Sequence, residues 1–178
     1  GDEALLTAIL ASLYAIEPEA DITVISGNPS ETTTKHRVKS LFRFDAGKIL
    51  SALGRADLLI SGGGSLLQDV TSKRSLAYYL SVIALAKLRG KKVMLFAQGI
   101  GPIRSGFMRF LTRIICRQAD VITVRDRESA EELVRLGLQR EKIEVTADSV
   151  LTLEPASREA GAAILQKAGL VLTEPIIG

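Results

Sequence analysis

The sequence ADLLISGGGSLLQD (residues 56–69) decides the fold. It begins with a short apolar run, which is typical of a strand buried on both faces of a sheet. Three glycines follow directly, Gly62, Gly63 and Gly64, and they allow the backbone to turn sharply and to approach another group closely. The apolar helical pattern SLAYYLSVIALAKLRG (75–90) comes next. A strand, a tight turn and a helix in this order indicate one unit of an α/β fold.

The same alternation of strand and helix patterns continues along the whole chain. The predicted helices are 1–16, 46–56, 75–90, 106–119, 128–137 and 157–169, and the predicted strands are 21–26, 56–61, 91–98, 120–125, 142–148 and 174–178. The polar segment 27–36 is predicted as a loop. Because several of the strands are continuously apolar, we expect an α/β protein with a Rossmann-like parallel sheet and helices on both of its faces.

Composition excludes several classes of protein. The chain has 178 residues, a net charge of only +3 and few aromatic residues, with no tryptophan, so nucleic acid is not an expected partner. Cys116 is the only cysteine, which excludes an internal disulfide, and it lies on an apolar helix face where we expect it in the core. His36 has no metal-ligand spacing around it, so we predict no metal site.

The two ends of the sequence suggest a division into domains. The chain opens on a helix pattern with no strand before it and closes within a predicted strand. We therefore expect residues 1–152 to form a Rossmann-like domain that lacks its first strand. Residues 153–178, which begin near Pro155, are expected to be a linker and the start of a truncated second domain.

The predicted topology also gives the place of a binding site. In open parallel sheets, ligands bind beyond the carboxyl ends of the strands. The residues that this edge would collect, together with the first turn of the opening helix, are Asp2, Glu3, Gly62, Gly63, Gly64, Ser65, Gln68, Asp69, Gln98, Gly99, Gly101, Arg125, Asp126 and Asp148. Arg74, near the start of the long helix, could meet a phosphate there, but a solvent-facing position is an equal alternative.

The three glycines allow two interpretations. Backbone N–H groups in such a turn suit an anion, but a strand-to-helix turn that only needs small residues would look the same. Gly-Lys-Ser/Thr does not follow, so the segment is not a P-loop, and it does not match G-x-G-x-x-G either.

Charged residues at strand ends and helix starts are the candidates for chemistry. Arg125 follows the strand pattern VITV and suits a phosphate or carboxylate, the alternative being an ion pair with Asp126 or a nearby loop acid. Asp126 is more simply a helix cap than a catalyst. Asp2 lies near the start of the first helix, where it could cap the helix or act as a general base. Ser129 and Glu132 have the spacing of a capping box.

Five segments occur in an order that resembles the polysaccharide pyruvyl transferase family, in particular its bacterial cell-surface anchoring enzymes. The segments are GDEALL (1–6), SGGGSLLQDVTSKRSLAYYL (61–80), AQGIGPI (97–103), VRDRES (124–129) and TADSV (146–150). The resemblance covers nearly the whole chain. It implies the N-terminal half of a GT-B-like two-domain enzyme, so this chain by itself is expected to be inactive.

The resemblance implies a specific reaction. A pyruvyl group would pass from phosphoenolpyruvate to a sugar, β-N-acetylmannosamine, of a lipid-linked cell-wall polysaccharide precursor, and the resulting pyruvate ketal would anchor S-layer proteins. Asp2 would be the acid/base and Arg125 part of the donor clamp, while the glycine loops and their polar neighbours would bind substrate. No cofactor is implied, and homo-oligomerisation stays open. The enzyme would be cytoplasmic, and the acceptor would bring it to the inner face of the membrane.

Two other functions remain open at this point. A GT-B glycosyltransferase that uses a sugar nucleotide would have the same fold. A non-catalytic binding module could also keep it.

Overall fold

The computed structural model describes residues 1–169. Its helices are α1 (Asp2–Ile16), α2 (Pro29–His36), α3 (Ala46–Arg55), α4 (Lys73–Leu88), α5 (Gly106–Cys116), α6 (Arg127–Arg135) and α7 (Arg158–Lys167), with 3-10 turns η1 (Arg140–Lys142) and η2 (Ser149–Thr152). Its strands are β1 (Thr23–Ser26), β2 (Lys39–Phe42), β3 (Leu58–Gly62), β4 (Lys92–Gln98), β5 (Val121–Val124) and β6 (Glu144–Val145). The predicted strand at 174–178 lies outside the described residues.

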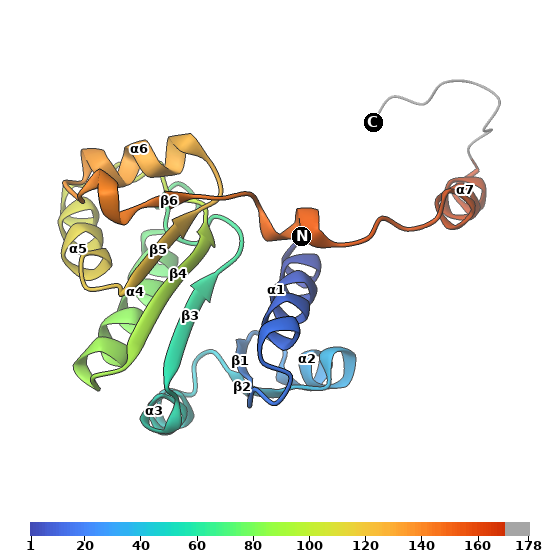
Figure 1. The fold of residues 1–178 in the computed structure, drawn as a ribbon, viewed down its shortest axis with the longest axis horizontal. Helices are drawn as coiled ribbons and strands as arrows, with labels where there is room; N and C mark the ends of the chain where they lie inside the picture. The colour runs from blue at the N-terminus through green and yellow to red at the C-terminus, as the bar shows by residue number, and fades with distance from the viewer. Residues whose placement is uncertain (170–178) are drawn as a thin grey trace.

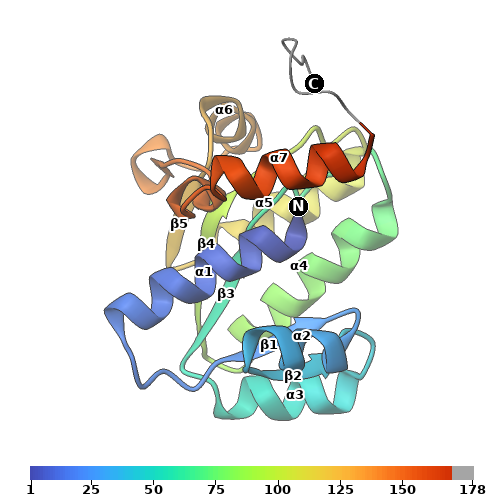
Figure 2. The ribbon, with the colours of Figure 1, turned by 90° about the vertical axis from the view of Figure 1, so that its right-hand side faces the viewer.

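The strands are all parallel, which confirms the predicted α/β, Rossmann-like class (Figure 1). They form two sheets, however, where one was expected. A four-stranded sheet has the order β3-β4-β5-β6, and β1 pairs only with β2. Helices α4 and α5 cover one face of the larger sheet, and α1 lies on the other side (Figure 2).

The main hydrophobic core lies between the larger sheet and helices α4, α5 and α6. Its most buried side chains include Leu76, Leu80, Ile83, Val93, Leu95, Cys116, Ile122, Val124 and Leu133. They come from helix positions three or four apart and from continuous strand runs, as expected for strands covered by helices. Cys116 is fully buried as predicted, and burial raises the pKa of its thiol to about 12.

One predicted loop is wrong. Residues 29–36 form helix α2, although their sequence, PSETTTKH, is polar. Pro29 at the first helical position has a φ suited to a helix start, and Thr32 is buried, with its hydroxyl bonded to that of Ser26 at 2.7 Å. The short strand β2, which follows, was not predicted. Tertiary contacts thus decide the structure of a segment whose own propensity is weak.

The described residues do not test the predicted division into domains. No residue of α7 is buried, and Figure 1 shows α7 apart from the sheets. A second domain, and a first strand before residue 1, stay predictions. Within residues 1–169, no helix is long and apolar enough to cross a membrane.

Candidate functional site

Two loops at the carboxyl edge of the larger sheet run side by side. Beyond the ends of β3 and β4, the N–H of Gly99 donates to the carbonyl of Gly64 at 2.9 Å, and the N–H of Gly101 donates to Leu67 at 2.8 Å. Leu67 and Ile100 form an isolated parallel bridge. The strand pairing therefore continues past the sheet, and it fixes the position of both loops.

The glycine triplet is explained in part by close packing of protein against protein. Gly63 and Gly64 have φ values of 78° and 66°, which favour glycine. A Cβ on Gly63 would lie 3.3 Å from Ile9 and 3.4 Å from Leu5 of α1. A Cβ on Gly62 would lie 2.9 Å from the carbonyl oxygen of Phe96. These contacts support the interpretation as a tight turn, and they leave open whether a ligand also touches the loop.

Gln98 is held within this pair of loops. It is fully buried, and its amide nitrogen donates to the carbonyl of Gly64 at 3.1 Å. The preceding residue, Ala97, has a φ of 45° at an irregularity in the β4–β5 register, and its N–H donates to the Thr123 hydroxyl. The amide oxygen of Gln98 is buried and has no hydrogen-bond partner within residues 1–169. An unsatisfied acceptor of this kind is uncommon in a folded protein.

Arg125 lies at the centre of the candidate site. Its Nε donates to Asp126 at 3.2 Å, one terminal nitrogen donates to Asp148 at 3.3 Å, and the other donates to the hydroxyl of Ser65 at 2.9 Å. The side chain is 30% exposed. The arrangement joins three of the strand-end loops through one guanidinium group. It also contains the ion pairs that were the alternative to a ligand role.

Asp126 caps helix α6, as predicted. Its carboxylate accepts the N–H of Ser129 at 2.7 Å, so the predicted capping box of Ser129 and Glu132 is wrong. The Ser129 hydroxyl instead accepts the N–H of Ile100 at 2.9 Å and ties α6 to the second loop. Burial alone would raise the pKa of Asp126, but the bonds from Ser129 and the pairing with Arg125 outweigh it and hold the pKa below its ordinary value.

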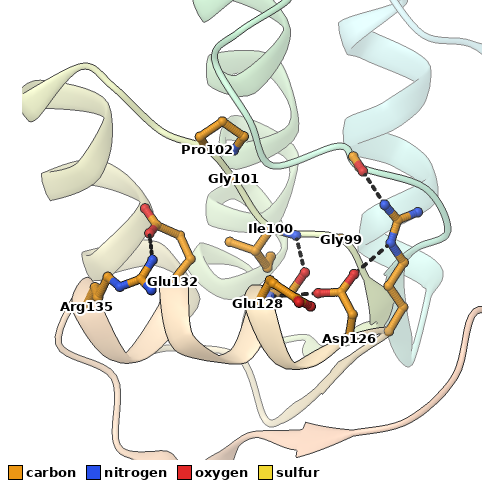
Figure 3. Close-up of a pocket in the computed structure, with 11 residues that line it drawn as sticks. Gly99, Ile100, Gly101, Pro102, Asp126, Glu128, Glu132 and Arg135 are labelled. Atoms are coloured by element: carbon orange, nitrogen blue, oxygen red, sulfur yellow. Dashed lines mark hydrogen bonds and ion pairs between the residues drawn. The ribbon is translucent and has the colours of Figure 1, made fainter.

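A pocket of about 310 Å³ lies beside Arg125, a volume at the lower end of the range for small-molecule sites. Figure 3 shows α6 on one side and the backbone of Gly99 to Pro102 on the other. Ser65, Gly99, Gly101, Arg125 and Asp126 of the predicted set line it, and so do Glu128, Ser129, Glu132 and Arg135, which were not predicted as site residues. Glu128, Glu132 and Arg135 follow one another at intervals of four and three residues, which places them on one face of α6 and was the available signal.

The lining of the pocket does not include four of the predicted site residues, Gln68, Asp69, Arg74 and Asp2. Gln68 bonds within its own turn, to Thr71. Asp69 is buried and accepts the N–H groups of Arg104 and Ser105, both at 2.8 Å. Arg74 is exposed at the start of α4.

Asp2, the fourth of these residues, is exposed at the first turn of α1. No side chain caps this helix, whose N-cap position is Gly1, so the capping interpretation of Asp2 is not supported. The neighbouring Glu3 contacts Lys35 at 2.9 Å and His36 at 3.0 Å, and these bonds lower its pKa. In residues 1–169, Asp2 makes no side-chain hydrogen bond or ion pair, and no three His, Cys, Asp or Glu side chains could together hold a metal.

Substitution of Gly99 tests the close packing around Arg125. A Cβ at this position would lie 2.8 Å from the Ser65 hydroxyl and 3.0 Å from the Arg125 guanidinium carbon. The φ of Gly99 is not in the left-handed region, so Gly99→Ala adds no backbone strain. We expect it to displace both side chains and to lower kcat/KM roughly 10- to 100-fold with little change in thermal stability. Gly106→Ala, which meets no atom within 4 Å, is the matched control. Equal activity of the two variants would contradict this role of Gly99.

Substitution of Asp69 tests whether this carboxylate holds the second loop. Burial alone would raise the pKa of Asp69, but the bonds from Arg104 and Ser105 hold it below its ordinary value. Its contribution to stability is therefore present above the unfolded-state pKa of about 3.9 and is lost as pH falls through the lower native pKa. We expect Asp69→Asn to lower the free energy of unfolding by about 1–3 kcal/mol at pH 7, and the difference from wild type to shrink as pH falls through the lowered native pKa of Asp69.

Denaturant unfolding across pH measures this difference. Asp57→Asn is the control, since Asp57 is exposed. Unchanged stability together with a loss of substrate affinity would contradict this role and would support substrate binding by Asp69.

The chain was compared with known proteins. A sequence model of the family described as Polysaccharide pyruvyl transferase matches residues 1–172. No curated protein and no solved structure gives a match.

Proposed function

Because the chain belongs to the polysaccharide pyruvyl transferase family, we propose that it contributes to pyruvyl transfer from phosphoenolpyruvate to a sugar of a lipid-linked cell-wall polysaccharide precursor. The observation that supports a site on this chain is the meeting of Ser65, Gly99 and Arg125 beside the pocket at the sheet edge. Membership of the family supports pyruvyl transfer to a polysaccharide in general. The donor, the acceptor and the roles of single residues are parts of the proposal.

The reaction sets clear chemical requirements. The methylene carbon of phosphoenolpyruvate takes up a proton and becomes a methyl group. Two acceptor hydroxyls bond to the neighbouring carbon, and its bond to the phosphate oxygen breaks. The two hydroxyls release two protons. One equals the proton that the methylene carbon takes up, and the other leaves with the phosphate. The site must therefore bind two anionic groups of the donor and move protons.

Arg125 and Arg135 are the guanidinium groups that line the pocket. Each already contacts carboxylates: Arg125 pairs with Asp126 and Asp148, and Arg135 pairs with Glu131 and Glu132. In our proposal the phosphate or carboxylate of the donor replaces the contact to Ser65 or to Asp148. Asp126 stays bound to Nε and keeps the guanidinium plane in position for bidentate binding.

Asp2 is proposed as the acid/base. It is an exposed carboxylate at the start of α1, and α1 packs against η2, the turn that directly follows Asp148. A carboxylate without another partner in the described part of the chain is free to take a proton from an acceptor hydroxyl.

The acceptor is proposed to be β-N-acetylmannosamine, and the test is a coupled assay. The intact protein is incubated with phosphoenolpyruvate and a lipid-linked acceptor that contains this sugar, and acceptor mass and free phosphate are followed together. We expect one phosphate per acid-labile pyruvyl group gained. Turnover with sugar nucleotides in place of phosphoenolpyruvate would overturn the proposal in favour of glycosyl transfer.

Arg125→Lys tests the donor clamp. Lysine keeps the charge but loses the planar fork that contacts Ser65, Asp126 and Asp148 together. We expect kcat/KM for phosphoenolpyruvate to fall roughly 100-fold or more, with a small change in melting temperature. Arg127→Lys on the exposed start of α6 is the control. Wild-type turnover in Arg125→Lys would leave Arg125 with a structural role only.

Asp2→Asn tests the acid/base. The amide has nearly the same shape but cannot accept a proton, so we expect kcat to fall roughly 100- to 10,000-fold while donor affinity is unchanged. Stability should also stay unchanged, because Asp2 does not cap α1. Retained activity would remove Asp2 from the proposed mechanism.

A further inference from the structure

Helix α5 exposes apolar side chains on the surface of the domain. Phe107 is 65% exposed, Phe110 is 56% exposed and Ile114 is 43% exposed. They lie three and four residues apart, so they share one side of the helix. The core-facing side of α5 has its own apolar residues, Met108 and Ile115 among them. Among the helices that the structure describes, α5 alone exposes three large apolar side chains.

This apolar stripe lies among positive charges. We define the α5 face as Phe107, Phe110 and Ile114 with the exposed Arg104, Arg113 and Arg117. Residues 58–119 contain ten lysines and arginines and a single carboxylate, Asp69, although the whole chain has a net charge of only +3. Asp69 is buried, and its oxygens bond to backbone N–H groups. Three of the ten cations pair with carboxylates that follow the segment, Lys87 and Lys92 with Asp120 and Arg109 with Glu132, whereas Arg104, Arg113 and Arg117 form no ion pair within residues 1–169.

Two carboxylates of the neighbouring helix α6 pair with cations that are not part of the α5 face. Its Glu132 pairs with Arg109 and Arg135, and its Glu131 pairs with Arg135. Arg117 donates to the carbonyl of Gly137 at 2.7 Å, a neutral partner. The cations of the α5 face are therefore available to contact a partner outside the described chain.

We infer that the α5 face binds the surface of an anionic lipid bilayer. A helix of this kind, with exposed phenylalanine beside arginine, can place its rings at the boundary between headgroups and acyl chains while its cations contact lipid phosphates. A protein partner would need a matched set of carboxylates around an apolar centre. A membrane of anionic lipids offers both features without a specific sequence.

The position of α5 connects this surface with the candidate site. The helix begins directly after the loop that carries Gly99 and Gly101, at the carboxyl edge of the sheet. Contact through Phe107 would hold this edge near the lipid surface. The inference thus deepens the proposed function, on which its link to a lipid-linked acceptor rests, whereas the binding itself requires no turnover.

Vesicle flotation tests the inference directly. The purified protein is mixed with vesicles of phosphatidylcholine alone, or with about a third of phosphatidylglycerol, both without acceptor. We expect binding to the anionic vesicles and its loss at high salt, because salt screens exposed charges. We expect the double variant Phe107→Ser/Phe110→Ser to bind at least roughly tenfold more weakly. Arg113→Glu/Arg117→Glu should lose at least as much, since each surface cation contributes about a fivefold factor.

Phe44→Ser is the matched control, because Phe44 is also 65% exposed but lies before α3. It should bind vesicles like wild type. Equal loss in this variant, or no preference of wild type for anionic vesicles, would overturn the inference. So would a wild-type dimer that the α5 variants make monomeric without any vesicle binding, since the face would then be a protein interface.

A separate assay with a water-soluble acceptor distinguishes this failure from failure of the proposed function. Turnover without vesicle binding would refute only the membrane contact. Vesicle binding without turnover would refute only the proposed transfer.

Discussion

The site depends on the pairing of two loops beyond the ends of β3 and β4. The bonds from Gly99 to Gly64 and from Gly101 to Leu67 extend the parallel sheet by several residues. Asp69 of the first loop and Ser129 of α6 also hold the second loop, because their side chains accept N–H groups of its backbone. Ser65 and Gly99 thereby meet Arg125, although the three residues lie far apart in the sequence.

The electrostatics of the site follow from this pairing. Arg125 lies at the sheet edge beside two carboxylates, Asp126 and Asp148. These carboxylates balance its charge before any ligand binds. Such a group serves as an oriented hydrogen-bond donor more than as a free positive charge. In the proposed donor clamp, an anion would replace one of these existing partners of Arg125.

Much of the fold could be predicted from the sequence, because apolar periodicity reports burial directly. The strands at 56–61, 91–98 and 120–125 and the helices between them were confirmed within a few residues. Helix α2 was missed because its polar sequence is stabilised by contacts such as that of Thr32 with Ser26. The separation of β1 and β2 from the larger sheet was also missed, since periodicity gives strands but not their partners.

The candidate site was predictable to a smaller extent. Topology alone placed Ser65, Gly99, Arg125, Asp126 and Asp148 at one edge, and the structure brings them together. The predicted topology did not indicate that Asp69 accepts backbone N–H groups of the next loop. It also did not indicate that Gly63 packs against α1. Such roles depend on contacts between loops distant in sequence. Glu132 was predicted only as part of a capping box and Arg135 was given no role, whereas one face of α6 lines the pocket.

The most direct measurement is a crystal structure of the intact protein with phosphoenolpyruvate bound. The account predicts a donor phosphate or carboxylate within hydrogen-bond distance of the Arg125 guanidinium, beside Gly99, with the contact to Ser65 or Asp148 replaced. A donor bound elsewhere, with Arg125 still joined to Ser65, Asp126 and Asp148, would contradict it.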